Sequence, residues 1–216
     1  MGDILKVGAP SSFQQLSMSF TMLVLNLIIV RVGGTDGVAV YSTGWRVVTV
    51  AILPLLGIAS AVVPVAGAAY GAREFGKLRE SFVYACKLGL AVEAVIGAAT
   101  LLLAPEISAV FTYSRGARRI SGDLTLFLQV IWIFYPGAAL GIPASSVFQG
   151  TGRGLNALAA TLLRTIVLSP PLCILFSSVL GLGLVGVWIG LDLSNLLGSG
   201  VSYLWARHHI SSISSR

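Results

Sequence analysis

Six long apolar stretches, separated by short turn-rich segments, decide what this chain can fold into. We expect helical spans at residues 10–32, 40–70, 81–104, 123–148, 156–180 and 183–206. Each stretch can cross the hydrocarbon core of a bilayer, which takes about 20 helical residues. Because an open sheet edge cannot be satisfied in lipid, and the alternating segments of a membrane barrel are absent, the sequence predicts an all-α polytopic membrane protein with six transmembrane helices.

Composition excludes a water-soluble enzyme. Hydrophobic residues make up 56% of the 216 residues and charged residues only 10%, far from the roughly 25% charged residues of a soluble domain. We expect no catalytic residue and no metal site, since Cys86 and Cys173 fall inside apolar stretches at unrelated spacing. The net charge of +6 comes from scattered basic residues, so the expected partner is the lipid bilayer and not nucleic acid.

The basic residues between the spans predict the orientation. If the first span starts inside, seven basic residues lie on the side of the termini, namely Lys6, Arg73, Lys77, Arg79, Arg153, Arg207 and Arg216. Four lie on the other side, namely Arg31, Arg115, Arg118 and Arg119. This bias favours cytoplasmic termini in the cell membrane. We therefore expect a cytoplasmic linker at 1–9, the bundle at 10–206 and a cytoplasmic tail at 207–216.

Two of the spans carry polar stripes at helical spacing. The first has Ser12, Gln15, Ser19, Met22 and Asn26 on one face, and the last has Trp188, Asp192, Asn195, Ser199 and Ser202. Such faces are unfavourable against lipid. The stripes indicate either a shared polar interior or cleft, or hydrogen bonds between helices that only hold the bundle together.

Three charged residues fall well inside apolar spans: Glu93, Arg164 and Asp192. A charge at a helix centre costs roughly 2.5–3.5 kcal/mol on the insertion scale. The two carboxylates are therefore candidate proton or cation sites, and Arg164 is a candidate counter-ion for either of them. The alternative for Glu93 and Asp192 is a structural role as members of ion pairs.

Prolines and small residues predict interrupted and closely packed helices. Pro54 and Pro64 fall in the second span, and Pro136 and Pro143 in the fourth; each removes a backbone donor and bends a helix unless the freed carbonyl finds a partner. Two pairs of glycines four residues apart, Gly67 with Gly71 and Gly186 with Gly190, permit close helix approach. These features suit either an ordinary bundle or a transporter whose helices bend.

Four strings resemble the multidrug and toxin extrusion (MATE) transporters. They are VGAPSSFQQ at residues 7–15, PLLGIASAVVPVAGAAYGA at 54–72, SSVFQGTG at 145–152 and GLVGVW at 183–188. Their order and spacing match the second half of that family, and the resemblance covers residues 7–207. It implies a protein of two six-helix lobes around a central cleft, which exchanges protons or sodium ions for bulky, often cationic and amphipathic compounds.

On this resemblance the chain is the C-terminal lobe and needs a second six-helix lobe, either an N-terminal half or a second copy of itself. One wall of the substrate cleft would be lined by Gln15, Asn26, Gln129, Trp132 and Tyr135. The coupling ion, H⁺ or Na⁺, would be bound mainly by the partner lobe. The positions that resemble the acidic sites of sodium-type members carry Gln14 and Gln15 and, around Ala138, no carboxylate.

Two other functions remain open. Flippases of lipids or lipid-linked oligosaccharides belong to the same superfamily, and their expected cationic cavity finds support in Arg46 and Arg164. A truncated bundle without transport activity is the third hypothesis. A drug-export assay and a lipid-flipping assay distinguish them.

Overall fold

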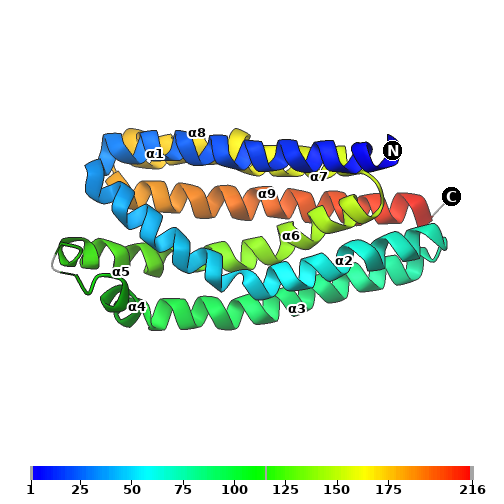
Figure 1. Cartoon of the computed structure of the whole chain (residues 1–216), viewed down its shortest axis with the longest axis horizontal. Helices are drawn as coiled ribbons and strands as arrows, with labels where there is room; N and C mark the ends of the chain where they lie inside the picture. Colours follow the sequence, from blue (N-terminus) through cyan, green and yellow to red (C-terminus); the bar gives the residue numbers. More distant parts are fainter. Residues whose placement is uncertain (1, 115, 215–216) are drawn as a thin grey trace.

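The structure is a computed structural model that describes residues 2–114 and 116–214, with side chains from residue 12 onward. Six helices in this part of the chain are long and apolar enough to cross a membrane, which confirms the all-α, six-span fold. They are Ser12–Ala51, Leu53–Gly71, Phe75–Leu102, Arg118–Gly150, Gly154–Val179 and Gly183–Ser214. Figure 1 shows them packed lengthwise, with both chain ends at the same end of the bundle.

The first two passes share one long helix, α1 (Gly2–Ala51), which bends at Gly34. Gly34 has φ +61° and ψ −155°, a conformation that side chains disfavour and glycine accepts. Beyond this bend the chain runs back and continues into α2 (Leu53–Gly71), so that the second part of α1 and α2 form the second pass (Figure 1). The expected continuous second span is therefore interrupted at Ile52, next to Pro54 at the start of α2.

The remaining four passes are also built from several segments. The third contains α3 (Phe75–Leu102) and α4 (Ala104–Phe111). The fourth contains η1 (Arg118–Ile120), α5 (Ser121–Val130), η2 (Ile131–Ile133) and α6 (Phe134–Gly150). The fifth contains α7 (Gly154–Leu162), η3 (Leu163–Leu168), α8 (Ser169–Ile174) and η4 (Leu175–Val179). The sixth is α9 (Gly183–Ser214).

Breaks within the fourth and fifth passes follow from proline. Pro136 has no N–H to donate to the Trp132 carbonyl, and the helix tightens into the 3₁₀ turn η2 just before it. In the fifth pass Pro170 and Pro171 lie between two π-helical turns, η3 and η4, which widen the helix. Pro64 and Pro143 lie inside α2 and α6 without ending them.

Helix α9 runs through the middle of the bundle, and small residues bring it close to its neighbours. A Cβ atom on Gly190 would lie 2.7 Å from the Cys173 Cα of α8, and one on Gly186 would meet the Phe176 carbonyl. This confirms the close approach predicted from the second glycine pair. Of the first pair, Gly67 packs against the Gly150 carbonyl, whereas Gly71 has nothing within 4 Å of its would-be Cβ atom.

The described residues at the two ends of the chain continue the first and the last helix. Residues 2–9 extend α1, and residues 207–214 extend α9; residues 1 and 215–216 lie outside the described part. The linker, the tail and the orientation remain predictions. At the opposite end of the bundle, an ion pair of 2.6 Å joins Arg119 of η1 to Asp36, just after the Gly34 bend.

Candidate functional site

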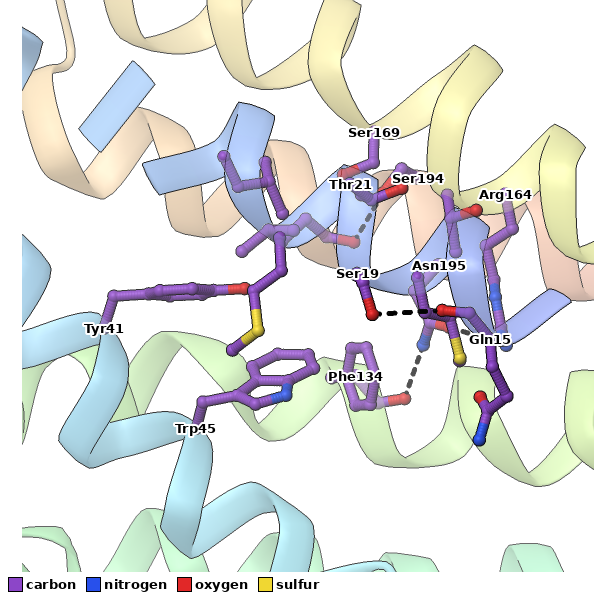
Figure 2. A pocket seen from close by; sticks show the side chains of 15 residues that line it. Gln15, Ser19, Thr21, Tyr41, Trp45, Phe134, Arg164, Ser169, Ser194 and Asn195 are labelled. Carbon is purple, nitrogen blue, oxygen red and sulfur yellow. Dashed lines mark hydrogen bonds between the residues drawn. The ribbon is translucent and has the colours of Figure 1, made fainter. Parts of the chain in front are cut away.

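Two adjoining cavities lie against the N-terminal part of α1. The first, of about 360 Å³, is formed by α1, α6, α9 and the fifth pass (Figure 2). It is lined by Gln15, Met18, Ser19, Thr21, Met22, Leu25, Tyr41, Trp45, Phe134, Arg164, Thr165, Ser169, Leu191, Ser194 and Asn195. The second, of about 810 Å³, reaches from α1 to α2, α6 and α7. Gln15, Met18 and Arg164 line both, so we call the two together the paired cavities.

The polar stripe of the first span lines these hollows. Gln15, Ser19 and Met22 face the first of the paired cavities, and Asn26 lies with Ser19 and Met22 in a third hollow of about 440 Å³ along α1. The Asn26 Oδ1 atom is buried without a hydrogen-bond partner. For the first span, the cleft interpretation of the stripe thus agrees with the structure.

The polar stripe of the last span lies mostly inside the bundle. Its five members, Trp188, Asp192, Asn195, Ser199 and Ser202, are all buried. Asn195 reaches the first cavity and Ser202 the second. Ser199 and Ser202 hydrogen-bond within α9, to the Asn195 side chain and the Gly198 carbonyl. The two interpretations of the polar stripes therefore apply to different helices. The stripe on α1 lines a cleft, whereas the stripe on α9 mainly makes buried polar contacts inside the bundle.

Arg164 projects from the π turn η3 to the border between the paired cavities. Its Nη1 atom donates to Asn195 Oδ1 at 3.4 Å, and Asn195 Nδ2 in turn donates to the Phe134 carbonyl at 2.7 Å (Figure 2). Among the described residues, no other Lys, Arg, Asp or Glu lines these cavities. The cavity wall therefore carries one positive charge.

The counter-ion prediction for Arg164 was wrong. The carboxylate oxygens of Glu93 and Asp192 are buried with no hydrogen-bond partner, and Arg164 contacts the neutral Asn195 instead. Glu93 lies on the face of α3 that packs against the fourth pass, at the centre of a buried stripe that includes Gly89 and Gly97. The three charges predicted at membrane depth are thus separated into one cavity-facing cation and two interior acids.

An aromatic group in the first cavity was not predicted. The rings of Tyr41 and Trp45 lie 5.6 Å apart, and the Phe134 ring meets Trp45 edge-on at 5.4 Å (Figure 2). Tyr41 also stacks on Trp188 at 5.8 Å, which fixes its orientation. The detectable signal was the spacing of Tyr41 and Trp45, four residues apart and so on one helix face.

The other three residues predicted for the cleft wall do not line the cavities. Gln129 is exposed and Trp132 is 38% exposed, both near the break in the fourth pass. Tyr135 is fully buried and packs against Gly97 of α3. The structure thus brings Gln15 and Asn26 to the hollows along α1, while a cleft role for Gln129, Trp132 and Tyr135 remains a prediction.

Comparisons with known proteins agree with the resemblance to the multidrug and toxin extrusion transporters. A family model described as MatE matches residues 10–175. A probable multidrug resistance protein, NorM, of Thermotoga maritima is 24% identical over 193 residues, which are 88% of this chain and 40% of that protein.

Two solved structures share the fold and 40% sequence identity. One is a MATE in complex with MaL6, with a TM-score of 0.97 over 99% of this chain and 48% of that one. The other is a MOP superfamily transporter from Pyrococcus furiosus, with a TM-score of 0.95 over 97% and 46%, for which reverse polarity of the binding pocket is said to suggest a different function. The chain therefore spans less than half the length of these relatives.

Proposed function

The chain belongs to the MatE family, and on this premise we propose that it forms one lobe, equivalent to the C-terminal half, of a cation-coupled multidrug efflux antiporter. The observation that carries the proposal is the pair of adjoining cavities on α1. The fourth and fifth passes beside them are interrupted by the 3₁₀ turn η2 and the π turn η3. Transporter sites characteristically lie beside such interrupted helices.

The chemistry of the first cavity suits an amphipathic organic cation. Tyr41, Trp45 and Phe134 offer aromatic surfaces, and the faces of such rings attract a cation by about 0.5–2 kcal/mol. Met18 and Met22 add flexible, polarisable surface that adapts to ligands of different shape. Gln15 and Ser19 add hydrogen-bonding groups without charge. This mixture favours broad recognition over tight selectivity.

Alternating access follows if a second six-helix lobe covers the cavity face. The partner is either the complementary N-terminal half or a second copy, and it would bind most of the coupling ion, H⁺ or Na⁺. Binding of that ion shifts the population between two openings of the cleft, and only to the extent that the ion binds one opening better. The breaks at η2 and η3 provide places where helices bend during this change.

Export of a fluorescent organic cation from energised membrane vesicles tests the proposal. The chain is expressed alone and together with the complementary half of a 40%-identical solved relative, with an imposed proton or sodium gradient. We expect gradient-dependent export with the companion half. If neither preparation exports the dye at matched membrane expression, the chain is a bundle without transport activity and the proposal fails.

The orientation is part of the same proposal. Arg73, Lys77, Arg79 and Arg153 lie in or near the turns at the end of the bundle where both chain ends lie (Figure 1). Their number supports cytoplasmic termini in the cell membrane. A phosphatase fused after the last helix should be inactive if this is right, because that enzyme folds only on the outer side; an active fusion contradicts it.

A second candidate function is a flippase for lipids or lipid-linked oligosaccharides. It is favoured by Arg164, the one charge on the paired cavities within the described residues, which attracts a phosphate and repels a cation. Replacing Arg164 with Gln then abolishes flipping of a fluorescent phospholipid in vesicles, whereas Arg164→Lys retains part of it. A drug antiporter shows the opposite preference, with cation export retained or improved in Arg164→Gln.

A further inference from the structure

Most hydrogen-bonding groups of Arg164 are unused, although this residue carries the one charge on the paired cavities within the described residues. A guanidinium has five N–H donors. Arg164 makes one hydrogen bond to the described residues, from Nη1 to Asn195 Oδ1 at 3.4 Å, which is longer than the usual range of about 2.7–3.2 Å. Its Nε and Nη2 atoms have no partner among these residues. A cation with free donors beside a cavity is suited to hold a ligand.

Two glycines make room for Arg164 at the junction of the cavities. A Cβ atom on Gly198 of α9 would lie 2.7 Å from the Arg164 Cβ atom, and one on Gly141 of α6 would lie 3.1 Å from Arg164 Nη1. The side chain therefore lies directly on α6 and α9, where a larger residue at either glycine would displace it. Because Arg164 lines both cavities, its guanidinium is accessible to a ligand that occupies either of them.

Two serine hydroxyls in the cavity walls also lack partners. Ser169 follows Arg164 by one π turn, so both lie on one face of the fifth pass and line the first cavity (Figure 2). Ser145 follows Gly141 by one turn of α6 and lines the second cavity. Both hydroxyl oxygens are buried without a hydrogen bond, which is uncommon for buried polar groups. Rotation about the Cα–Cβ bond can turn each hydroxyl toward its cavity.

The described residues supply no anion to pair with Arg164. No Asp or Glu among them lines the paired cavities, and the carboxylate oxygens of Glu93 and Asp192 make no hydrogen bond. A guanidinium remains charged throughout the physiological pH range, and an unpaired charge at membrane depth is unfavourable. A ligand that brings a negative charge therefore binds here more tightly than a neutral ligand of the same shape.

The geometry of arginine and the shape of the first cavity indicate the class of ligand. The planar guanidinium matches the oxygens of a carboxylate or a phosphate, which accept two parallel hydrogen bonds. Beside it, Tyr41, Trp45 and Phe134 present aromatic surfaces to the first cavity. This cavity of about 360 Å³ has the size of a small-molecule site. The site thus suits an amphipathic compound that carries an oxyanion next to an aromatic or apolar body.

We propose that Arg164, Ser145 and Ser169 form an oxyanion-binding site at the junction of the paired cavities. Its ligand is the carboxylate or phosphate group of an amphipathic compound whose apolar part occupies the first cavity. This oxyanion belongs either to a transported compound, which is then an acid or a zwitterion, or to a lipid headgroup. The step from binding to export rests on the proposed antiport, whereas the binding itself does not.

Two rhodamine dyes that differ by a single methyl group test the site without transport. One has a free carboxylate and is a zwitterion, and the other is its methyl ester and a cation. The fluorescence anisotropy of each dye is measured with the whole chain in lipid nanodiscs, and empty nanodiscs give the background. We expect the acid to bind about 10- to 100-fold more tightly than the ester, because the ester cannot pair with the guanidinium. Equal affinities, or tighter binding of the ester, overturn the proposal.

Variants of the three residues locate the preference for the acid. Arg164→Gln should reduce the affinity of the acid to that of the ester, and Arg164→Lys should retain part of the difference. Ser145→Ala and Ser169→Ala should each weaken binding of the acid by about 2- to 10-fold. The control Arg79→Gln removes an equal charge from an exposed position outside the cavities and should leave both affinities unchanged. A preference that survives in Arg164→Gln overturns the proposal, and the comparison of the two dyes on wild-type protein requires no variant to fold.

Competition separates the two sources of the oxyanion. Short-chain phosphatidate is added to the complex with the acid dye, and short-chain diacylglycerol, which lacks the phosphate, is the matched control. Displacement by phosphatidate alone assigns the site to lipid headgroups, whereas no displacement assigns it to the acidic group of a soluble compound. Export of both dyes from vesicles is measured separately. Preferential binding of the acid without export refutes the antiport and leaves the site, whereas export with equal affinities for the two dyes refutes the site alone.

Discussion

The Asn195 side chain on α9 donates a 2.7 Å hydrogen bond to the main-chain carbonyl of Phe134, the first residue of α6. This carbonyl belongs to the segment where the fourth pass is interrupted, and Asn195 Oδ1 also accepts from Arg164. One amide thus connects the fourth, fifth and sixth passes beside the first cavity.

Replacing Asn195 with Ala should destabilise the lobe. The change leaves the Phe134 carbonyl and the Arg164 guanidinium each without a partner, at a cost of about 1–2 kcal/mol. For a chain of this size that corresponds to a lower melting temperature by about 2–8 °C. Thermal unfolding in detergent measures it. The control Ser42→Ala, which removes only a local bond on an exposed face, should stay within about 0.5 kcal/mol of wild type.

Gly190→Ala and Gly200→Ala should have different effects although both lie on α9. The new Cβ atom at position 190 would lie 2.7 Å from the Cys173 backbone, so α8 and α9 must move apart. Such overpacking costs typically about 1–3 kcal/mol. Position 200 has nothing within 4 Å, and there alanine should be neutral or slightly stabilising because it favours helix. Equal melting temperatures would contradict the close packing described.

Trp45→Ala should weaken binding of an organic cation to the first cavity. The substitution removes the ring that lies between Tyr41 and Phe134. A lost cation–π contact of about 0.5–2 kcal/mol raises the dissociation constant about 2- to 30-fold. Fluorescence titration with the dye measures it. Tyr84→Ala, which removes an exposed aromatic residue distant from the cavities, is the matched control; a similar loss in both variants would place the dye elsewhere.

The ion pair between Arg119 and Asp36 should contribute little stability despite its 2.6 Å distance. Both side chains remain largely accessible, at 68% and 43%, so water and salt screen the attraction. A double-mutant cycle with Arg119→Gln and Asp36→Asn should give a coupling free energy of about 0–1 kcal/mol that vanishes in high salt. A larger, salt-independent value would mean that the pair fixes the Gly34 bend.

Hydropathy predicted the six spans because apolar content averaged over about 20 residues depends little on detail. The proline at 136 likewise marked the region of the η2 break. The contact partners of individual side chains were harder to predict, because they depend on which face each helix presents to its neighbours. We paired Arg164 with an acid in the sequence because these residues carry opposite charges inside apolar spans. In the structure Arg164 lies on the side of its helix that faces the cavities, and Glu93 lies on a buried face of α3.

Tyr135 shows the same limit for neutral residues. It was predicted to line the substrate cleft because of the resemblance to the multidrug and toxin extrusion transporters. The packing of α6 on α3 instead buries Tyr135 fully, with its ring against Gly97. The π turns around Pro170 and Pro171 escaped prediction because they require knowledge of how a helix redistributes its hydrogen bonds.

The central position of α9 has a consequence for how the lobe is made. The last pass touches all the others: Leu184 lies against Gly33, Trp188 against Tyr41, Tyr203 against Phe82, Asn195 against Phe134, and Gly190 against Cys173. A ribosome delivers the five earlier passes to the membrane before their common neighbour exists. Until α9 inserts, lipid or translocation machinery must cover the surfaces that it will later bury. Assembly of this lobe is therefore completed from the inside, by the helix that is synthesised after the other five.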